Sequence, residues 1–114
     1  MRSRSLVILT LSTVLCAEDV PSFAKDIAPI FSARCTECHG DKKAKAGLRL
    51  DSLEATLKGS VDEKVVVPGK SAKSELFELI SRKPGEDDIM PPKGKPLTAD
   101  QIALIKRWID AGAK

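Results

Sequence analysis

Hydrophobic residues along this chain recur mainly at helical spacing. The first such stretch predicts a helix from about Ser22 to Arg34, because its apolar residues fall at i, i+4, i+7 and i+8 on one face: Phe23, Ile27, Ile30 and Phe31. Ser22 is a residue type that caps helix N-termini. A second, shorter pattern, Leu76 to Ile80, predicts a helix capped by Ser71 or Ser74 that ends near Lys83, before Pro84-Gly85.

The last helix has the clearest start signal. Thr98 and Gln101 form a capping box, in which the hydroxyl accepts from the N3 amide and the Gln side chain returns the bond. Ile102, Ile105 and Ile109 then share one face, and Gly112 suits the position that stops the helix. These signals predict a terminal helix that starts at Thr98 and stops at Gly112.

The segments between these helices are mostly polar. Residues 40–47 are rich in lysine, 52–58 predict one or two helical turns, and 65–67 predict a brief extended piece. Residues 86–96 hold three prolines and one glycine, which predicts an irregular loop. No internal repeat or interdomain linker is present, so the pattern predicts one small all-α domain.

The N-terminus has the layout of a secretory signal peptide. Arg2 and Arg4 precede an almost unbroken apolar run, 6–15, and Ala17 offers a small residue for cleavage. The run is shorter than the roughly 20 residues of a spanning helix. We therefore expect a signal peptide at 1–17, a domain at 18–114, and export to the periplasm or another extracytoplasmic space. An uncleaved anchor and a lipid anchor at Cys16 are the alternatives; Leu15 is an unusual residue before a lipidated cysteine.

Cleavage after Ala17 would leave 97 residues (114 − 17) and remove two of the 19 basic residues, so the net charge falls from +3 to +1. No basic stripe with interleaved aromatic residues is present, which argues against nucleic-acid binding. No segment after residue 17 is apolar enough to span a membrane. The helical faces are narrow for so small a chain, which suggests that the core includes something besides side chains.

A CxxCH motif, the attachment signal of c-type haem, lies at residues 35–39, with the sequence Cys35-Thr36-Glu37-Cys38-His39. Two thiols three residues apart lie on one side of a helical turn and can form thioethers with the two vinyl groups of a porphyrin. His39, the next residue, is then placed to bind the iron. The sequence therefore predicts one covalently attached haem c, with Cys35 and Cys38 as anchors and His39 as an iron ligand.

Two other uses of the cysteine pair are open. A redox-active dithiol is one, but the chain lacks the βαβ pattern of a thioredoxin-like fold. A structural zinc site is the other, but it needs four ligands, and these are the only Cys and His residues after residue 17.

Met90 is the candidate for the second axial ligand of the iron. After removal of Met1 it is the only methionine, and no second histidine exists. The prolines that follow it, Pro91 and Pro92, stiffen the backbone, and methionine ligation raises the reduction potential of a haem. Lys93 or Lys95 as the ligand, or an open iron site, are the alternatives.

Further residues are candidates for the surroundings of a haem. The apolar pocket candidates are Phe31, Leu48, Leu50, Phe77, Ile89, Leu97 and Trp108. Arg49 or Lys70 is a candidate partner for a haem propionate. Lys42, Lys43 and Lys45 follow the attachment signal and are candidates for steering an acidic partner, although charge runs are usually solvated loops.

Several segments together resemble the planctomycete-type cytochrome c domain: FAKDIAPIFSARCTECHG (23–40), GLRLDS (47–52), VVPGKSAKSELFELI (66–80), MPPKGKPLT (90–98) and IALIKRWIDAGA (102–113). The resemblance implies a small class I cytochrome c fold, with three to four short helices around one haem. It also implies crossed N- and C-terminal helices, Cys35 and Cys38 as thioether anchors, and His39 and Met90 as axial ligands.

These observations predict an electron carrier rather than an enzyme, because two axial ligands leave no iron position for substrate. Its expected partners are redox proteins, donor and acceptor, which it would meet as a monomer or as a component of a larger electron-transfer complex. One rival is a haem enzyme or a gas or redox sensor with a displaceable Met90. The other is a module without haem that contains a Cys35–Cys38 disulfide or a metal.

Overall fold

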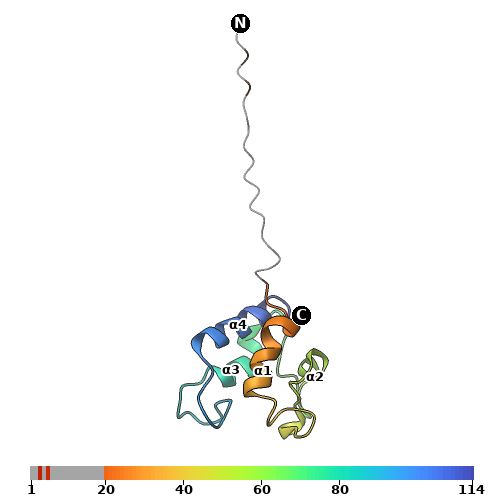
Figure 1. Cartoon of the computed structure of the whole chain (residues 1–114), viewed down its shortest axis with the longest axis vertical. Helices are drawn as coiled ribbons and strands as arrows, with labels where there is room; N and C mark the ends of the chain where they lie inside the picture. Colours follow the sequence, from red (N-terminus) through yellow and green to blue (C-terminus); the bar gives the residue numbers. More distant parts are fainter. Residues whose placement is uncertain (1–2, 4, 6–19) are drawn as a thin grey trace.

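The computed structural model describes residues 3, 5 and 20–114. Its residues 20–114 form helices and loops, with one isolated bridge between His39 and Ala44 and no strand. The predicted all-α class is therefore confirmed for this part of the chain (Figure 1). The expected signal peptide and Cys16 lie outside the described residues, apart from Ser3 and Ser5.

The first helical segment has the predicted extent but two geometries. It begins as a π-helix, η2 (Phe23–Ile27), and continues as α1 (Ala28–Arg34). Ser22 is the N-cap, as predicted: its hydroxyl accepts from the Lys25 amide at 3.2 Å. The amide of Ala28 donates to Phe23 O, five residues back. Pro29, which follows, has no N–H to continue an α-helical ladder, so the change of geometry falls at this proline.

The middle of the chain holds short helices. These are the 3₁₀ turn η3 (Lys45–Gly47), α2 (Leu53–Lys58), the 3₁₀ turn η4 (Ser71–Lys73) and α3 (Glu75–Ile80). The turns predicted over 52–58 are confirmed as α2, with Ser52 as its cap. The extended piece at 65–67 is not a strand, although Val65 O accepts a hydrogen bond from the Leu76 amide.

The sequence prediction for α3 is confirmed at its start, where Ser74 is one of the two predicted caps, and is wrong at its end. Ser74 is at the N-cap position, but its hydroxyl forms no cap bond and instead accepts from Val67 N and donates to Lys70 O, each at 2.9 Å. The helix ends at Ile80 and not near Lys83. Both the amide and the hydroxyl of Ser81 donate to Phe77 O, which closes the last turn.

The terminal helix α4 (Ala99–Asp110) matches its prediction closely. The capping box is complete, with bonds of 3.1 and 2.9 Å between Thr98 and Gln101. At the other end Gly112 N donates to Ile109 O and Ala113 N to Trp108 O, the two bonds of a Schellman motif. Gly112 has φ of +112°, a conformation that favours glycine.

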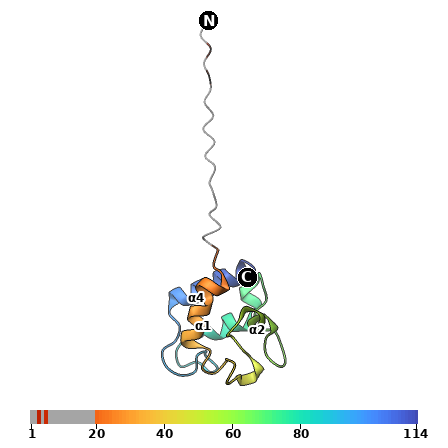
Figure 2. The same cartoon turned by 45° about the vertical axis from the view of Figure 1, so that its right-hand side comes forward.

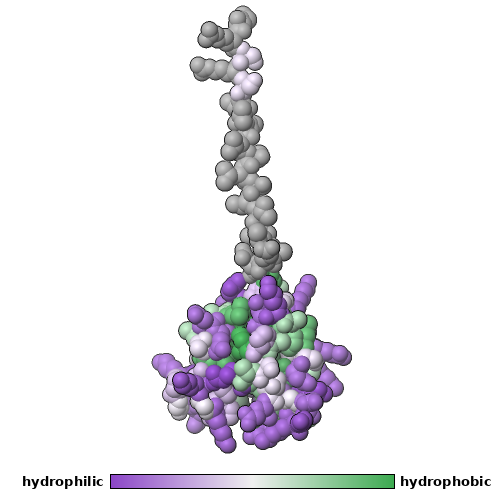
Figure 3. All heavy atoms as spheres, in the orientation of Figure 1, coloured by the Kyte–Doolittle hydropathy of each residue, from purple (hydrophilic) through white to green (hydrophobic). Residues whose placement is uncertain are grey.

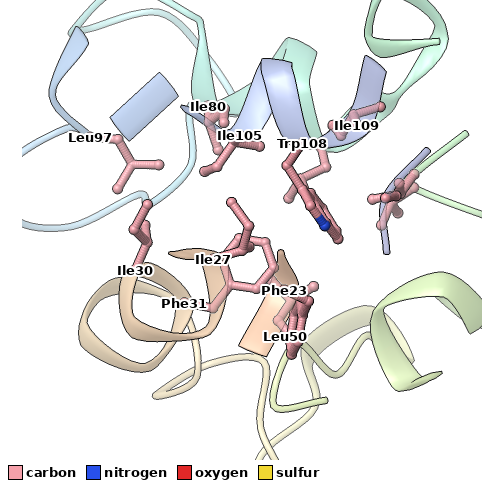
Figure 4. Close-up of a cluster of buried hydrophobic side chains, with 14 of the residues drawn as sticks. Phe23, Ile27, Ile30, Phe31, Leu50, Ile80, Leu97, Ile105, Trp108 and Ile109 are labelled. Carbon is pink, nitrogen blue, oxygen red and sulfur yellow. The ribbon is translucent and has the colours of Figure 1, made fainter. Parts of the chain in front are cut away.

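The core lies between the first helical segment and α4, which pack side by side in both ribbon views (Figures 1 and 2). Side chains from the two point toward one another in Figure 4. Trp108 is fully buried, with its ring centroid 5.9 Å from that of Phe23 and 6.3 Å from that of Phe31. Its indole N–H and the Phe23 amide both donate to Lys114 O, which joins the two ends of the domain.

Hydrophilic side chains cover most of the face shown in Figure 3, with smaller hydrophobic areas between them. Among the described residues, no helix combines the length and the apolar character needed to cross a membrane.

Candidate functional site

Cys35, Cys38 and His39 lie together on one turn at the end of α1. Cys35 is the C-cap of that helix, and its amide donates to Phe31 O at 2.8 Å. The carbonyl of Cys35 then accepts from both Cys38 N at 3.2 Å and His39 N at 3.0 Å. The backbone therefore continues through one more helical turn, so three residues of the CxxCH sequence are placed on it without help from the rest of the chain.

The two thiols are free and half-buried. Cys35 packs against the hydrophobic core, and this burial raises the pKa of its thiol to about 11, although nearby Arg34 lowers it in part. Reactive dithiols need the opposite shift, because the thiolate is the nucleophile. The Cys35 environment thus disfavours a redox-active dithiol, whereas a thioether carries no proton and is well suited to an apolar site.

His39 is held by its backbone on both sides. Its amide donates to Cys35 O, and its carbonyl accepts from Leu50 N at 2.7 Å. The ring atom Nδ1 is buried and has no hydrogen-bond partner among the described residues. A buried polar atom without a partner is costly, and an imidazole is the commonest metal ligand. This ring therefore fits a site that binds an additional group.

Gly40 completes the turn in a way that the sequence reasoning missed. Its amide donates to Lys43 O at 2.7 Å. A Cβ on this residue would lie well within 3.0 Å of the carbonyl oxygen of Thr36, and real Cβ atoms essentially never come so close to another atom. The sequence does contain a sign of this close contact: a glycine directly follows CxxCH, and a residue without a Cβ allows two backbone segments to approach each other.

Met90 comes from the long loop between α3 and α4. It is half-buried and packs against the same hydrophobic core as Cys35. Its amide donates to Leu79 O near the end of α3 at 3.1 Å. In both ribbon views this loop and the segment after α1 lie at the end of the domain opposite the C-terminus (Figures 1 and 2). The structure thus places Met90 and the CxxCH turn at one end of one core.

The other residues predicted to surround a haem fall into two groups, those in the core and those exposed to solvent. Of the pocket candidates, Phe77 and Ile89 are half-buried and five are buried: Phe31, Leu48, Leu50, Leu97 and Trp108. The proposed propionate partners are exposed, and Arg49 already donates to Asp51 through Nε at 3.1 Å and Nη2 at 2.6 Å. Lys42, Lys43 and Lys45 are exposed.

Two surface hollows lie elsewhere. One, of about 340 Å³, lies between α2 and residues 59–61, and the other, of about 450 Å³, lies beside α3. None of the four predicted site residues lines either hollow. Over residues 20–114, moreover, no three Cys, His, Asp or Glu side chains are grouped so that they could hold a metal ion by themselves.

Residues 35–94 match the protein family described as planctomycete cytochrome C. The chain belongs to the planctomycete cytochrome C family. The matched segment is 60 residues long (94 − 35 + 1), just over half of the 114, and it begins at Cys35 and includes Met90. The comparison with curated proteins and the comparison with solved structures each give no match.

Membership in this family makes the chain a c-type cytochrome, a class of haem proteins that transfer electrons. The fit of the residues agrees with it: two thiols and an imidazole lie on one turn, the imidazole has an unpartnered buried nitrogen, and a thioether-bearing loop lies at the same end of the core. The sequence resemblance is therefore confirmed, and a module without haem does not agree with the family assignment.

Proposed function

We propose that this protein is an exported c-type cytochrome that carries single electrons on one covalently attached haem. Cys35 and Cys38 would form the thioethers, and His39 and Met90 would be the axial ligands of the iron. The observation that carries the proposal is the family match, which begins at CxxCH and extends past Met90. Bound haem would supply an iron that takes up and releases one electron at a time.

The local geometry supports the attachment residues. The turn at the end of α1 places the two thiols and the imidazole within five residues of one backbone segment, 35–39. The half-buried Cys35 side chain packs against the hydrophobic core, which suits a porphyrin edge. His39 is fixed at both its amide and its carbonyl, so its ring has limited freedom to leave the site.

The surroundings of Met90 support the second ligand. Its backbone is fixed to α3, and its side chain is half-buried against the core rather than free in solvent. A thioether sulfur opposite an imidazole favours the reduced iron and raises the potential, as suits an electron carrier. If His39 and Met90 both held the iron, no iron position would be left for a substrate, and the chemistry that the haem would supply is the transfer of single electrons to and from partner proteins.

Export is part of the proposal. The signal-like layout of 1–17 supports a mature domain at 18–114 in the periplasm or an equivalent space. Mass spectrometry of the protein recovered from an exporting host tests this. We expect a mature chain that begins at Glu18. A lipid-modified chain that begins at Cys16 would instead show that the protein is anchored to a membrane by its lipid.

Replacement of Met90 by Ala tests the ligand assignment. We expect the variant to have a lower reduction potential and its reduced form to bind carbon monoxide, because one iron position is open. Glu86→Ala is the control, since Glu86 is an exposed residue on the same loop and is not a candidate for the haem pocket. An unchanged reduction potential in Met90→Ala would show that Met90 is not a ligand of the iron. Rapid carbon monoxide binding by the unaltered protein would instead favour the sensor or enzyme.

A further inference from the structure

The segment from Ser81 to Met90, called here the Met90 loop, leaves the end of α3 and returns to it. It turns at residues 83–86, where Glu86 N donates to Lys83 O at 3.0 Å and Gly85 has φ of +90°. The Met90 amide then donates to Leu79 O at 3.1 Å. The last carbonyls of a helix have no partner within it, so this bond both caps α3 and fixes the backbone of Met90.

One side chain joins the two limbs of this loop. Arg82 Nη1 donates to the carbonyl of Asp87 at 2.6 Å, and Nη2 donates to Glu78 Oε1 at 3.1 Å. A third, longer contact of 3.7 Å joins Nη1 to Asp88 Oδ2. The Arg82 side chain is only 28 % exposed, although its acidic partners Glu78 and Asp88 are 66 % and 81 % exposed.

The chemistry of arginine explains this position. A planar guanidinium presents several N–H groups in fixed directions, so it can bind a carboxylate on α3 and a carbonyl across the loop simultaneously. The ammonium of lysine is a point charge on a flexible stem and does not fix two partners in the same way. The neighbouring Lys83 side chain makes no hydrogen bond or ion pair within residues 20–114, so the bridging role belongs to Arg82 alone of this pair.

We propose that Arg82 is the positioning residue that holds the Met90 loop so that the Met90 sulfur stays at the iron. This inference rests on the axial ligation proposed above. Arg82 fixes Asp87, three residues before Met90, and the Leu79 bond fixes Met90 itself, so residues 88 and 89 lie between two anchors. Without the first anchor the loop samples more conformations, and an external ligand competes better with the tethered sulfur.

A competition experiment on the oxidised, haem-loaded protein tests this. Imidazole is titrated into the wild type and into Arg82→Ala, Arg82→Lys and Lys83→Ala. We expect the affinity for imidazole to rise about tenfold in Arg82→Ala, equivalent to about 1.4 kcal/mol, with a weaker far-red band of the methionine–iron bond. Arg82→Lys should give an intermediate rise. Lys83→Ala should match the wild type, because it removes the same charge from the same loop but no bond.

Two further variants separate the possible outcomes. Asp110→Ala removes the acceptor of the Ser71 amide, and so a bond between η4 and the end of α4, outside the Met90 loop. Equal rises in Asp110→Ala and Arg82→Ala would mean that general destabilisation is responsible. Equal rises in Lys83→Ala and Arg82→Ala would mean a charge effect. Either result overturns the role of Arg82.

Met90→Ala separates this inference from the proposed function. If Met90→Ala binds imidazole strongly while Arg82→Ala stays within twofold of the wild type, the ligand assignment survives and the role of Arg82 is overturned. If Met90→Ala itself matches the wild type, Met90 is not the ligand, and both proposals fall together.

Discussion

Replacement of Trp108 by Phe should loosen the contact between the two ends of the domain. Trp108 is fully buried between Phe23 and Phe31, and its indole N–H donates to Lys114 O at 3.1 Å. Phe31 is also the residue whose carbonyl accepts the Cys35 amide, so this aromatic cluster directly supports the end of α1 that carries the attachment turn.

The expected loss has two parts. The hydrogen bond is worth about 1 kcal/mol, and its loss leaves Lys114 O with the Phe23 amide as a partner. The smaller ring removes roughly two buried carbon atoms at about 0.8 kcal/mol each. Because the void left behind is incompletely filled, the free energy of unfolding should fall by roughly 2–3 kcal/mol in total.

Guanidinium unfolding of the haem-loaded protein, followed by far-ultraviolet circular dichroism, measures this loss. Lys106→Ala is the control on the same helix, since its ion pair with Asp110 is exposed to solvent and should contribute little to stability. A loss below about 0.5 kcal/mol in Trp108→Phe would refute the reasoning, because the cluster would then not hold the two ends of the domain together.

Three further changes give distinct outcomes. Gly40→Ala should destabilise the folded protein by about 2 kcal/mol and reduce the yield of attached haem, because its methyl group meets the Thr36 carbonyl; normal yield and stability would show that the turn relaxes freely. Thr98→Ala should lower the free energy of unfolding by about 1 kcal/mol through loss of the capping box, measured in the same denaturant assay. The Ser71 amide lowers the pKa of Asp110 below its value in the unfolded chain, so the stabilisation by this carboxylate is present above about pH 3.8 and is lost as the pH falls through the lowered pKa. In acid titrations the difference in unfolding free energy between wild type and Asp110→Asn should therefore shrink below that pH; a constant difference would contradict the linkage.

Features of the fold that depend on neighbouring residues could be predicted from the sequence. The capping box at Thr98 and the stop at Gly112 involve only residues of one helix end, and both are as predicted. The attachment turn is largely local, because the bonds donated by the Cys35, Cys38 and His39 amides each join residues within four positions of one another. The bond from the Leu50 amide to His39 O, by contrast, spans eleven positions. The family match then agrees with the function predicted from that turn.

Features that depend on the path of the chain in space could not be predicted from the sequence. Ser74 looks like a helix cap in sequence, yet its hydroxyl binds a loop that returns beside it. Arg82 looks like any surface cation, and its bond to Asp87 exists only because the Met90 loop turns back at 83–86. The pairing of Arg49 with Asp51 likewise needed the structure, since two charges two residues apart need not meet.

The central claim, one covalently attached haem ligated by His39 and Met90, is tested most directly by an absorption spectrum. The protein is produced by export in a host that attaches c-type haem, and the spectrum of the folded protein is recorded in the oxidised and reduced states. A separate denatured sample shows whether the haem stays attached to the chain. The account predicts a sharp low-spin spectrum of c-type haem when reduced and the weak far-red band of a methionine–iron bond when oxidised. A protein without haem absorbance would contradict it.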